Sequence, residues 1–150
     1  VTGSTHKPNG MRDVRTKDVH DKLVRRLVLK IESAREKIAR VEVEIDEGAE
    51  VGVLAYGATA RPAKGAVLKA RQEGRKVSFC RPVTIWPFPS HEIKRVCKGL
   101  RRLIVPEMNL GQLAREIERY VDCEVVRVSR IGGVLHTSQE IYDEIVEAGA

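Results

Sequence analysis

The order of apolar and polar positions divides the chain into a helical segment and an α/β segment. Between His20 and Val41, apolar residues recur at intervals of three or four, which is typical of one face of an α-helix (Leu23, Leu27, Ile31, Ala34, Ile38 and Val41). Residues 41–45 then alternate apolar and acidic side chains, which predicts a short exposed strand or an extended lead-in. Asp46-Glu47-Gly48 is a turn signal.

After this turn, short apolar runs alternate with amphipathic segments. Strands are expected at 50–56, 76–81, 102–106 and 124–129, and helices at 59–73, 90–97, 110–121 and 138–148. This alternation predicts βαβ units with right-handed crossovers and a mostly parallel sheet. We therefore expect a loop or tether over 1–19, a long basic amphipathic helix with its lead-in over 20–45, and an α/β domain over 46–150.

Charge is distributed unevenly along the chain. The net charge of +6 lies within the first 40 residues, and the remainder is balanced. A basic helix is one sign of nucleic-acid binding, but aromatic residues make up only 4 % of the chain, no recognition motif is present, and the apolar stripe must be covered. We therefore expect no nucleic-acid partner. No apolar run is long enough for a membrane span and the start lacks the apolar core of a signal peptide, so a cytoplasmic location is expected.

Metal binding is not expected. The three cysteines, Cys80, Cys97 and Cys123, are 17 and 26 residues apart and form no Cys-x-x-Cys pair. An iron–sulfur or zinc site needs more ligands at closer spacing. The four histidines also lack metal-ligand spacing. The cysteines are interpreted as reduced, buried or half-buried thiols.

Candidate chemistry lies where strands end, because open α/β sheets bind ligands at the carboxyl ends of their strands. Tyr56–Arg61 (YGATAR) connects a strand to a helix, and the free N–H groups of a helix start together with an arginine can hold an anion. The alternative is a tight turn in which Thr59 caps the helix. The absence of a full Gly-x-Gly-x-x-Gly gives no support for dinucleotide binding. The candidate anion-binding residues are Gly57, Ala58, Thr59, Arg61, Arg81, Gly132 and Gly133.

Two further strand ends predict contact surfaces. The loop Arg81–Pro89 (RPVTIWPFP) holds the only tryptophan between prolines, as rigid interface anchors do, although a core position for Trp86 is equally consistent. In Pro106–Gln112 (PEMNLGQ), Asn109 is a candidate N-cap, and Glu107 is a candidate general base without an evident partner; capping with subunit contact is favoured. The candidate interface residues are Trp86, Phe88, Glu107, Met108, Asn109 and Leu110.

These motifs also carry a family resemblance. The runs AYGATARPAKGAV, RPVTIWPFP, VPEMNLGQLAREIERY and RIGGVLHTSQEIYDEI occur in this order and resemble the C-terminal part of 2-oxoacid:ferredoxin oxidoreductase alpha subunits of the 2-oxoglutarate type. The opening VTGSTHKPNG and the helix VHDKLVRRLVLKI are similar to the segment before that domain. The resemblance covers nearly the whole chain, and PEMNLGQL and RPVTIWPFP are its most specific parts.

The resemblance implies a fold, a reaction and a set of cofactors. The fold would be a three-layer α/β sandwich of the transketolase C-terminal type. The family decarboxylates a 2-oxoacid on thiamine diphosphate with Mg²⁺, passes electrons through iron–sulfur clusters to ferredoxin, and transfers the acyl group to coenzyme A. The Gly-Asp-Gly…Asn pattern that holds the diphosphate is absent here. No catalytic residue can therefore be assigned, and this chain is expected to bind no cofactor and to be inactive alone.

The implied partners are a beta subunit, a second alpha subunit and, for the whole complex, ferredoxin. A structural and interface role is thus the first prediction. A regulatory module that binds a small anion or a nucleotide such as coenzyme A is the alternative.

Overall fold

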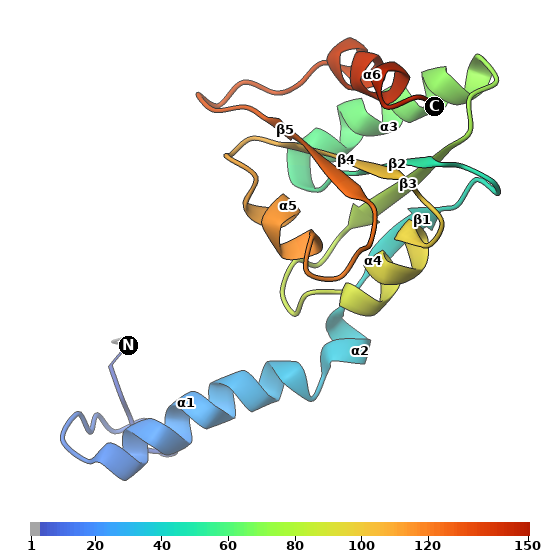
Figure 1. Ribbon diagram of the computed structural model, residues 1–150. Helices are drawn as coiled ribbons and strands as arrows, with labels where there is room; N and C mark the ends of the chain where they lie inside the picture. The colour runs from blue at the N-terminus through green and yellow to red at the C-terminus, as the bar shows by residue number, and fades with distance from the viewer. Residues whose placement is uncertain (1–3) are drawn as a thin grey trace. The chain divides into compact units, whose positions relative to one another are not determined.

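The computed structural model describes residues 4–150 and consists of two compact units, which divide between Ala39 and Arg40 (Figure 1). The first unit contains α1 (Lys17–Glu32) and the short α2 (Arg35–Ile38). Residues 1–3 of the predicted tether lie outside the described residues. No helix in the described part of the chain is long and apolar enough to span a membrane.

The predicted single helix is in fact two helices. At the end of α1 the N–H of Ser33 donates to the carbonyl of Leu29, and the N–H of Ala34 donates to the carbonyl of Ile31 three residues back, which tightens the last turn. Serine also competes with the helical backbone for hydrogen bonds. The apolar periodicity of the sequence thus extends beyond the helix itself, which ends at Glu32. None of the side chains of α1 is buried.

The second unit is the predicted α/β domain. Its elements are β1 (Val41–Glu44), β2 (Val51–Leu54), the 3₁₀ turn η1 (Gly57–Thr59), α3 (Ala60–Gln72), β3 (Val77–Pro82), α4 (Ser90–Cys97), β4 (Arg102–Glu107), α5 (Gln112–Ile117), β5 (Glu124–Ser129) and α6 (Ser138–Glu147). The strands form one sheet in the order β1-β3-β2-β4-β5. All neighbours are parallel except β1, which pairs antiparallel with β3. The mostly parallel sheet is confirmed.

The unit begins earlier than the sequence suggested. Residues 41–44 were predicted as a short strand or a lead-in before a domain starting at residue 46. Because this segment is hydrogen-bonded to β3 as the edge strand, it belongs to the sheet, and the compact unit starts at Arg40.

Helices cover both faces of the sheet, which gives the three layers that the resemblance implied. In Figure 1, α3 and α6 lie on one face, and α4 and α5 lie on the other. Alternate strand residues enter two separate cores, since side chains of a strand alternate between faces. One core joins Val53, Phe79 and Ile104 to α3 and α6; the other joins Leu54, Leu103 and Val105 to α4 and α5.

The four parallel strands have their carboxyl ends at one edge of the sheet. The segments that follow them there are η1 after β2, residues 83–89 after β3, residues 108–111 after β4 and residues 130–137 after β5. All candidate residues of the sequence analysis lie at this edge.

Candidate functional site

The first candidate segment is a tight turn at the end of β2. Gly57 has a φ of 55°, a conformation that glycine adopts without strain, and it opens η1. The hydroxyl of Thr59 is buried and donates to the carbonyl oxygen of Tyr56 at 2.7 Å. Thr59 therefore closes the turn, and its side chain does not cap α3 as the alternative reading had supposed.

A hollow of about 590 Å³ lies beside this turn. Its lining includes four residues of the predicted anion-binding set: Gly57, Ala58, Arg61 and Arg81. The other three are placed differently, because Thr59 is buried, and Gly132 and Gly133 are exposed and do not line the hollow. Their loop contributes Leu135 instead.

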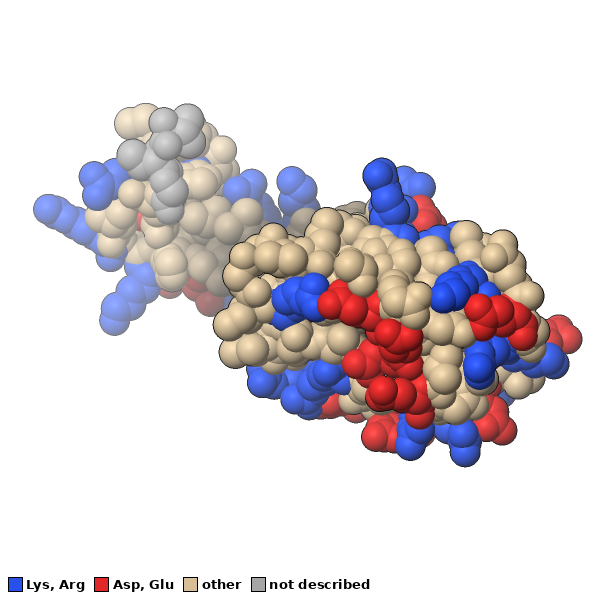
Figure 2. All heavy atoms as spheres, turned by 90° about the horizontal axis from the view of Figure 1, so that it is seen from above, with Lys and Arg blue, Asp and Glu red and all other residues tan. Residues whose placement is uncertain are grey.

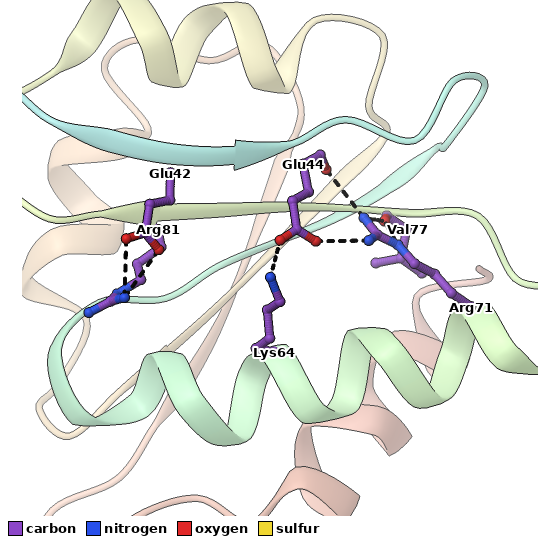
Figure 3. A network of polar contacts seen from close by, with 6 residues as sticks. All are labelled: Glu42, Glu44, Lys64, Arg71, Val77 and Arg81. Carbon is purple, nitrogen blue, oxygen red and sulfur yellow. Dashed lines mark hydrogen bonds and ion pairs between the residues drawn. The ribbon is translucent and has the colours of Figure 1, made fainter.

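Most of the positive charge around this hollow is already paired (Figure 3). Arg81 Nη1 donates to the two carboxylate oxygens of Glu42 at 3.3 and 3.1 Å. Glu44 accepts from Lys64, and it accepts from Arg71 Nη1 at 3.0 Å. The hydrogen bond from Lys64 is the main reason that the pKa of Glu44 is lowered, with a further contribution from Arg71 and with burial opposing both.

Arg61 is the exception. It is exposed at the start of α3 and has no ion pair or hydrogen bond among the residues that the structure describes. Glu42 and Glu44 occupy alternate positions of β1, so both face α3 and bring negative charge to this side of the sheet (Figure 3). The arrangement thus offers one unpaired cation to an anion rather than a cluster of cations.

The charge of the outer surface is mixed. Viewed from above, acidic side chains form a band between basic ones (Figure 2). The helix α6 supplies four acidic residues and no Lys or Arg: Glu140, Asp143, Glu144 and Glu147.

The second feature of this edge is a buried carboxylate at the end of β4. Glu107 is only 1 % exposed. Its Oε1 accepts from the Tyr56 hydroxyl at 2.9 Å and from Asn109 Nδ2 at 3.0 Å. The backbone N–H groups of Leu113 and Ala114, in the first turn of α5, donate to Oε1 and Oε2 at 3.0 Å each.

Glu107 and Asn109 together cap α5. Asn109 Oδ1 accepts from the N–H groups of Gly111 and Gln112 at 2.8 Å each, so it satisfies the first free donor of α5, although the N-cap residue is Gly111, two positions after the predicted one. The larger role of Glu107 was not predicted, because its partner Tyr56 is 51 residues away in the chain. A carboxylate enclosed by four donors presents no oxygen to a substrate, so the structure does not support a general base here.

The candidate interface residues divide into exposed and buried members. Trp86 is 62 % exposed and Leu110 is 64 % exposed, whereas Met108 and Asn109 are half-buried. Phe88 is 6 % exposed and stacks on Tyr120 with ring centroids 5.1 Å apart. Phe88 and Glu107 therefore support the loops from inside and offer no contact surface.

Other apolar side chains at the same edge were not singled out from the sequence. The exposed ones are Val83, Ile85, Ile131, Val134 and Leu135. We call these five residues, with Trp86 and Leu110, the apolar rim. A signal was available in the run Ile131–Leu135, because apolar residues flank two glycines in a segment with no helical or strand period.

Metal ions in proteins require a set of ligand side chains that lie close together. Within residues 4–150, no three His, Cys, Asp or Glu side chains are grouped closely enough to bind a metal ion.

The mostly parallel sheet, with helices on both faces and apolar loops at its carboxyl edge, is an α/β fold of the transketolase C-terminal type. A split-gene transketolase, described as an inactive beta4 tetramer, has this fold, with a TM-score of 0.59 at 18 % identity over 73 % of this chain and 41 % of that one. The 2-oxoglutarate:ferredoxin oxidoreductase from Magnetococcus marinus, solved with 2-oxoglutarate, coenzyme A and succinyl-CoA bound, gives a TM-score of 0.80 at 28 % identity, covering 98 % of this chain and 26 % of that one.

The particular family follows from a sequence model. Residues 49–141 match the pyruvate:ferredoxin oxidoreductase core domain II, and the chain belongs to this family. The chain is 39 % identical over 148 residues to the 2-oxoglutarate synthase subunit KorA of Methanothermobacter marburgensis, covering 97 % of this chain and 40 % of the relative. It is 38 % identical over 119 residues to the ketoisovalerate oxidoreductase subunit VorB of the same organism, covering 79 % of this chain and 34 % of that one.

The resemblance inferred from the motifs is thus confirmed. The chain spans about 40 % of the length of the 2-oxoglutarate synthase subunit that it matches.

Proposed function

We propose that the chain serves as core domain II in the alpha subunit of a 2-oxoglutarate:ferredoxin oxidoreductase, with a structural and subunit-interface role. The observation that carries this proposal is the similarity to a 2-oxoglutarate synthase subunit over 97 % of the chain. The complete cytoplasmic complex would use thiamine diphosphate, Mg²⁺, iron–sulfur clusters and coenzyme A. This chain would contribute no catalytic group to that chemistry, since the buried carboxylate of Glu107 at the carboxyl edge is fully used in capping α5.

The apolar rim is the proposed contact surface. Seven exposed apolar side chains lie on the three loops that follow β3, β4 and β5, at one edge of the sheet. Soluble domains seldom leave such a set of side chains in water without a partner. Trp86 is its largest member, and tryptophan is the residue type most often found to dominate binding energy. The proposed partners are the beta subunit and a second alpha subunit, with ferredoxin binding to the complete complex.

The test is co-expression of the chain with the beta subunit, followed by affinity capture and measurement of the dissociation constant. The Trp86→Ala variant should bind about 30-fold more weakly, since loss of a central tryptophan costs about 2 kcal/mol or more. Leu68→Ala is the matched control, because Leu68 is 46 % exposed on α3, away from the rim. Equal binding by both variants would show that the rim is not the interface.

The apolar stripe of α1 is a second proposed contact. None of its side chains is buried, although Leu23, Leu27 and Ile31 lie on one face of the helix. We expect Leu27→Asp to weaken assembly of the complex, while Lys22→Glu on the polar side has little effect. An unchanged complex mass for Leu27→Asp would contradict this role.

Arg61 supports a second candidate function, the binding of a small anion. Phosphate and coenzyme A should then raise the melting temperature of the wild type and not of Arg61→Ala, since a ligand that binds only the folded state stabilises it. Stabilisation by phosphate combined with no effect of Trp86→Ala on subunit binding would favour the anion-binding module over the interface role.

A further inference from the structure

A second hollow lies at the opposite edge of the sheet, where the strands begin. It has a volume of about 540 Å³ and is lined by the end of α4, by the turn before β4 and by the segment before β5. Two of its lining residues are cysteines: Cys97, the last residue of α4, and Cys123, which directly precedes β5. Cys97 is buried, and Cys123 is half-buried.

Backbone hydrogen bonds of the sheet bring the two cysteines together. Arg102 of β4 pairs with Glu124 of β5, and the N–H of Glu124 donates to the carbonyl of Arg101 at 2.9 Å. On the other side, the N–H of Leu100 donates to the carbonyl of Cys97 at 3.1 Å and closes the turn into β4. Both side chains pack against the core beneath α4 and α5, and both line the same hollow.

The two thiols differ in pKa and in accessibility. Interaction with the Cys97 side chain lowers the pKa of Cys123, against the effects of burial and of the neighbouring Asp122. The same interaction, together with burial, raises the pKa of Cys97. Cys123 therefore has the greater thiolate character and is the more accessible, so it is the nucleophile of the pair.

The third cysteine provides an internal reference. Cys80 is fully buried in β3 and does not line the hollow, and burial raises its pKa to about 12. Its thiol should not react while the domain is folded.

The wall of the hollow favours anionic reagents. Lys94, Arg95 and Lys98 contribute positive charge, and Asp122 is the single carboxylate among the lining residues. Arg95 is held by Glu92 at 2.7 Å, but Lys94 and Lys98 have no ion pair within residues 4–150. An anionic molecule entering the hollow would thus meet a net positive field next to the Cys123 sulfur.

We propose that Cys97 and Cys123 form a thiol–disulfide exchange site that accepts small anionic disulfides. The Cys123 thiolate attacks one sulfur of the disulfide RSSR, a Cys123–S–S–R bond forms, and RS⁻ leaves. Cys97 then attacks the Cys123 sulfur, the Cys97–Cys123 disulfide forms, and the second RS⁻ leaves with the proton of the Cys97 thiol. The protein dithiol loses two electrons and RSSR is reduced to two thiols. This inference rests on the residues of the hollow and is independent of the proposed oxidoreductase role.

The test uses the reduced, folded chain and 5,5′-dithiobis(2-nitrobenzoate), an anionic disulfide whose released thiol is coloured. The wild type should rapidly release two thiols per chain, and its intact mass should fall by two hydrogen atoms. Cys97→Ala should release one thiol and keep the reagent bound at Cys123, because no second thiol can displace it. Cys123→Ser should release thiol only slowly.

Three results would overturn the proposal. One is a wild type that keeps the bound reagent as Cys97→Ala does, since the two sulfurs would then not join. Another is rapid reaction of Cys123→Ser. The third is modification of Cys80 at the same rate as Cys123, because reaction would then report unfolding. Near-ultraviolet circular dichroism verifies that each variant is folded.

The preference for anions is tested separately. The double variant Lys94→Gln/Lys98→Gln should react several-fold more slowly with the anionic reagent and at an unchanged rate with uncharged 2,2′-dithiodipyridine. Lys69→Gln on α3, remote from the hollow, is the control and should change neither rate. Equal slowing with both reagents, or with neither, would show that the lysines do not select the charge of the disulfide.

Discussion

Replacement of Glu107 by glutamine tests how the carboxyl edge of the sheet is held together. The substitution keeps the size of the side chain but replaces one carboxylate oxygen by an NH₂ group. If the remaining oxygen takes the Oε1 position, it can still accept from Tyr56, Asn109 and the N–H of Leu113. The NH₂ group then faces the N–H of Ala114, a buried donor that loses its acceptor. The opposite orientation of the amide would leave three donors without an acceptor instead of one.

The expected cost follows from these contacts. A hydrogen bond to a charged group contributes about 1.5–3 kcal/mol, and leaving a buried donor without an acceptor costs about 1–3 kcal/mol. Both figures describe the loss of the same hydrogen bond, so they are not added. Removal of negative charge from the start of α5 adds about 0.3–1 kcal/mol. We therefore expect Glu107→Gln to lower the free energy of unfolding by about 2–4 kcal/mol, or the melting temperature by about 5–15 °C for a chain of this size.

Near-ultraviolet circular dichroism is the appropriate assay. All tryptophan, tyrosine and phenylalanine residues lie between residues 40 and 150, so this signal reports the α/β unit without a contribution from α1. Two variants calibrate the result. Tyr56→Phe removes one donor from a carboxylate that keeps three others and should cost about 0.5–1.5 kcal/mol. Glu118→Gln removes a surface ion pair with Arg127 and should cost less than about 1 kcal/mol. A Glu107→Gln variant within about 0.5 kcal/mol of the wild type would refute the capping argument.

Three further predictions concern the face covered by α3 and α6. A Cβ at Gly65 would lie 2.8 Å from Ser138 Oγ, so Gly65→Ala should destabilise the wild type and become neutral or stabilising beside Ser138→Ala, as a double-mutant cycle of unfolding free energies would measure. Glu140 has a pKa lowered to about 2, chiefly by the Arg130 side chain and then by Thr137. The ionised Glu140 carboxylate therefore stabilises the folded state above its unfolded-state pKa, and this stabilisation is lost as the pH falls towards 2. The difference in unfolding free energy between wild type and Glu140→Gln should shrink between about pH 5 and pH 2. A difference constant over that range would contradict this. Ile145→Ala, at a fully buried position, should cost about 2–5 kcal/mol in urea unfolding, and a cost below about 1 kcal/mol would show that α6 is loosely packed.

The architecture also shows what the residues of the two most specific motifs contribute. In PEMNLGQL, Glu107 and Asn109 hold α5 against β4 from the inside, while Leu110 is presented on the outside. In RPVTIWPFP, Phe88 packs against Tyr120 while Trp86 is exposed. Each motif thus combines a buried support with an exposed apolar side chain, as a rigid contact surface requires.

Much of this protein was determined by the sequence alone. The alternation of short apolar runs with segments of helical period predicted the parallel sheet, because a strand buried on both faces and an amphipathic helix have different apolar periods. The order of four loop motifs was sufficient for the family. The charge asymmetry, with all of the net positive charge before residue 41, can also be read directly from the sequence.

The tertiary structure decided what depends on the distance between segments remote in the chain. The sequence could not show that Tyr56 donates to Glu107, that β1 joins the sheet, or that Cys97 and Cys123 line the same hollow, because strand order and register set these contacts. Nor could it separate Trp86 from Phe88: both are aromatic residues between prolines, and only the packing of Tyr120 against one of them decides which is buried. Local periodicity fixes the elements, whereas burial of a loop side chain is a property of the surfaces that the fold brings next to it.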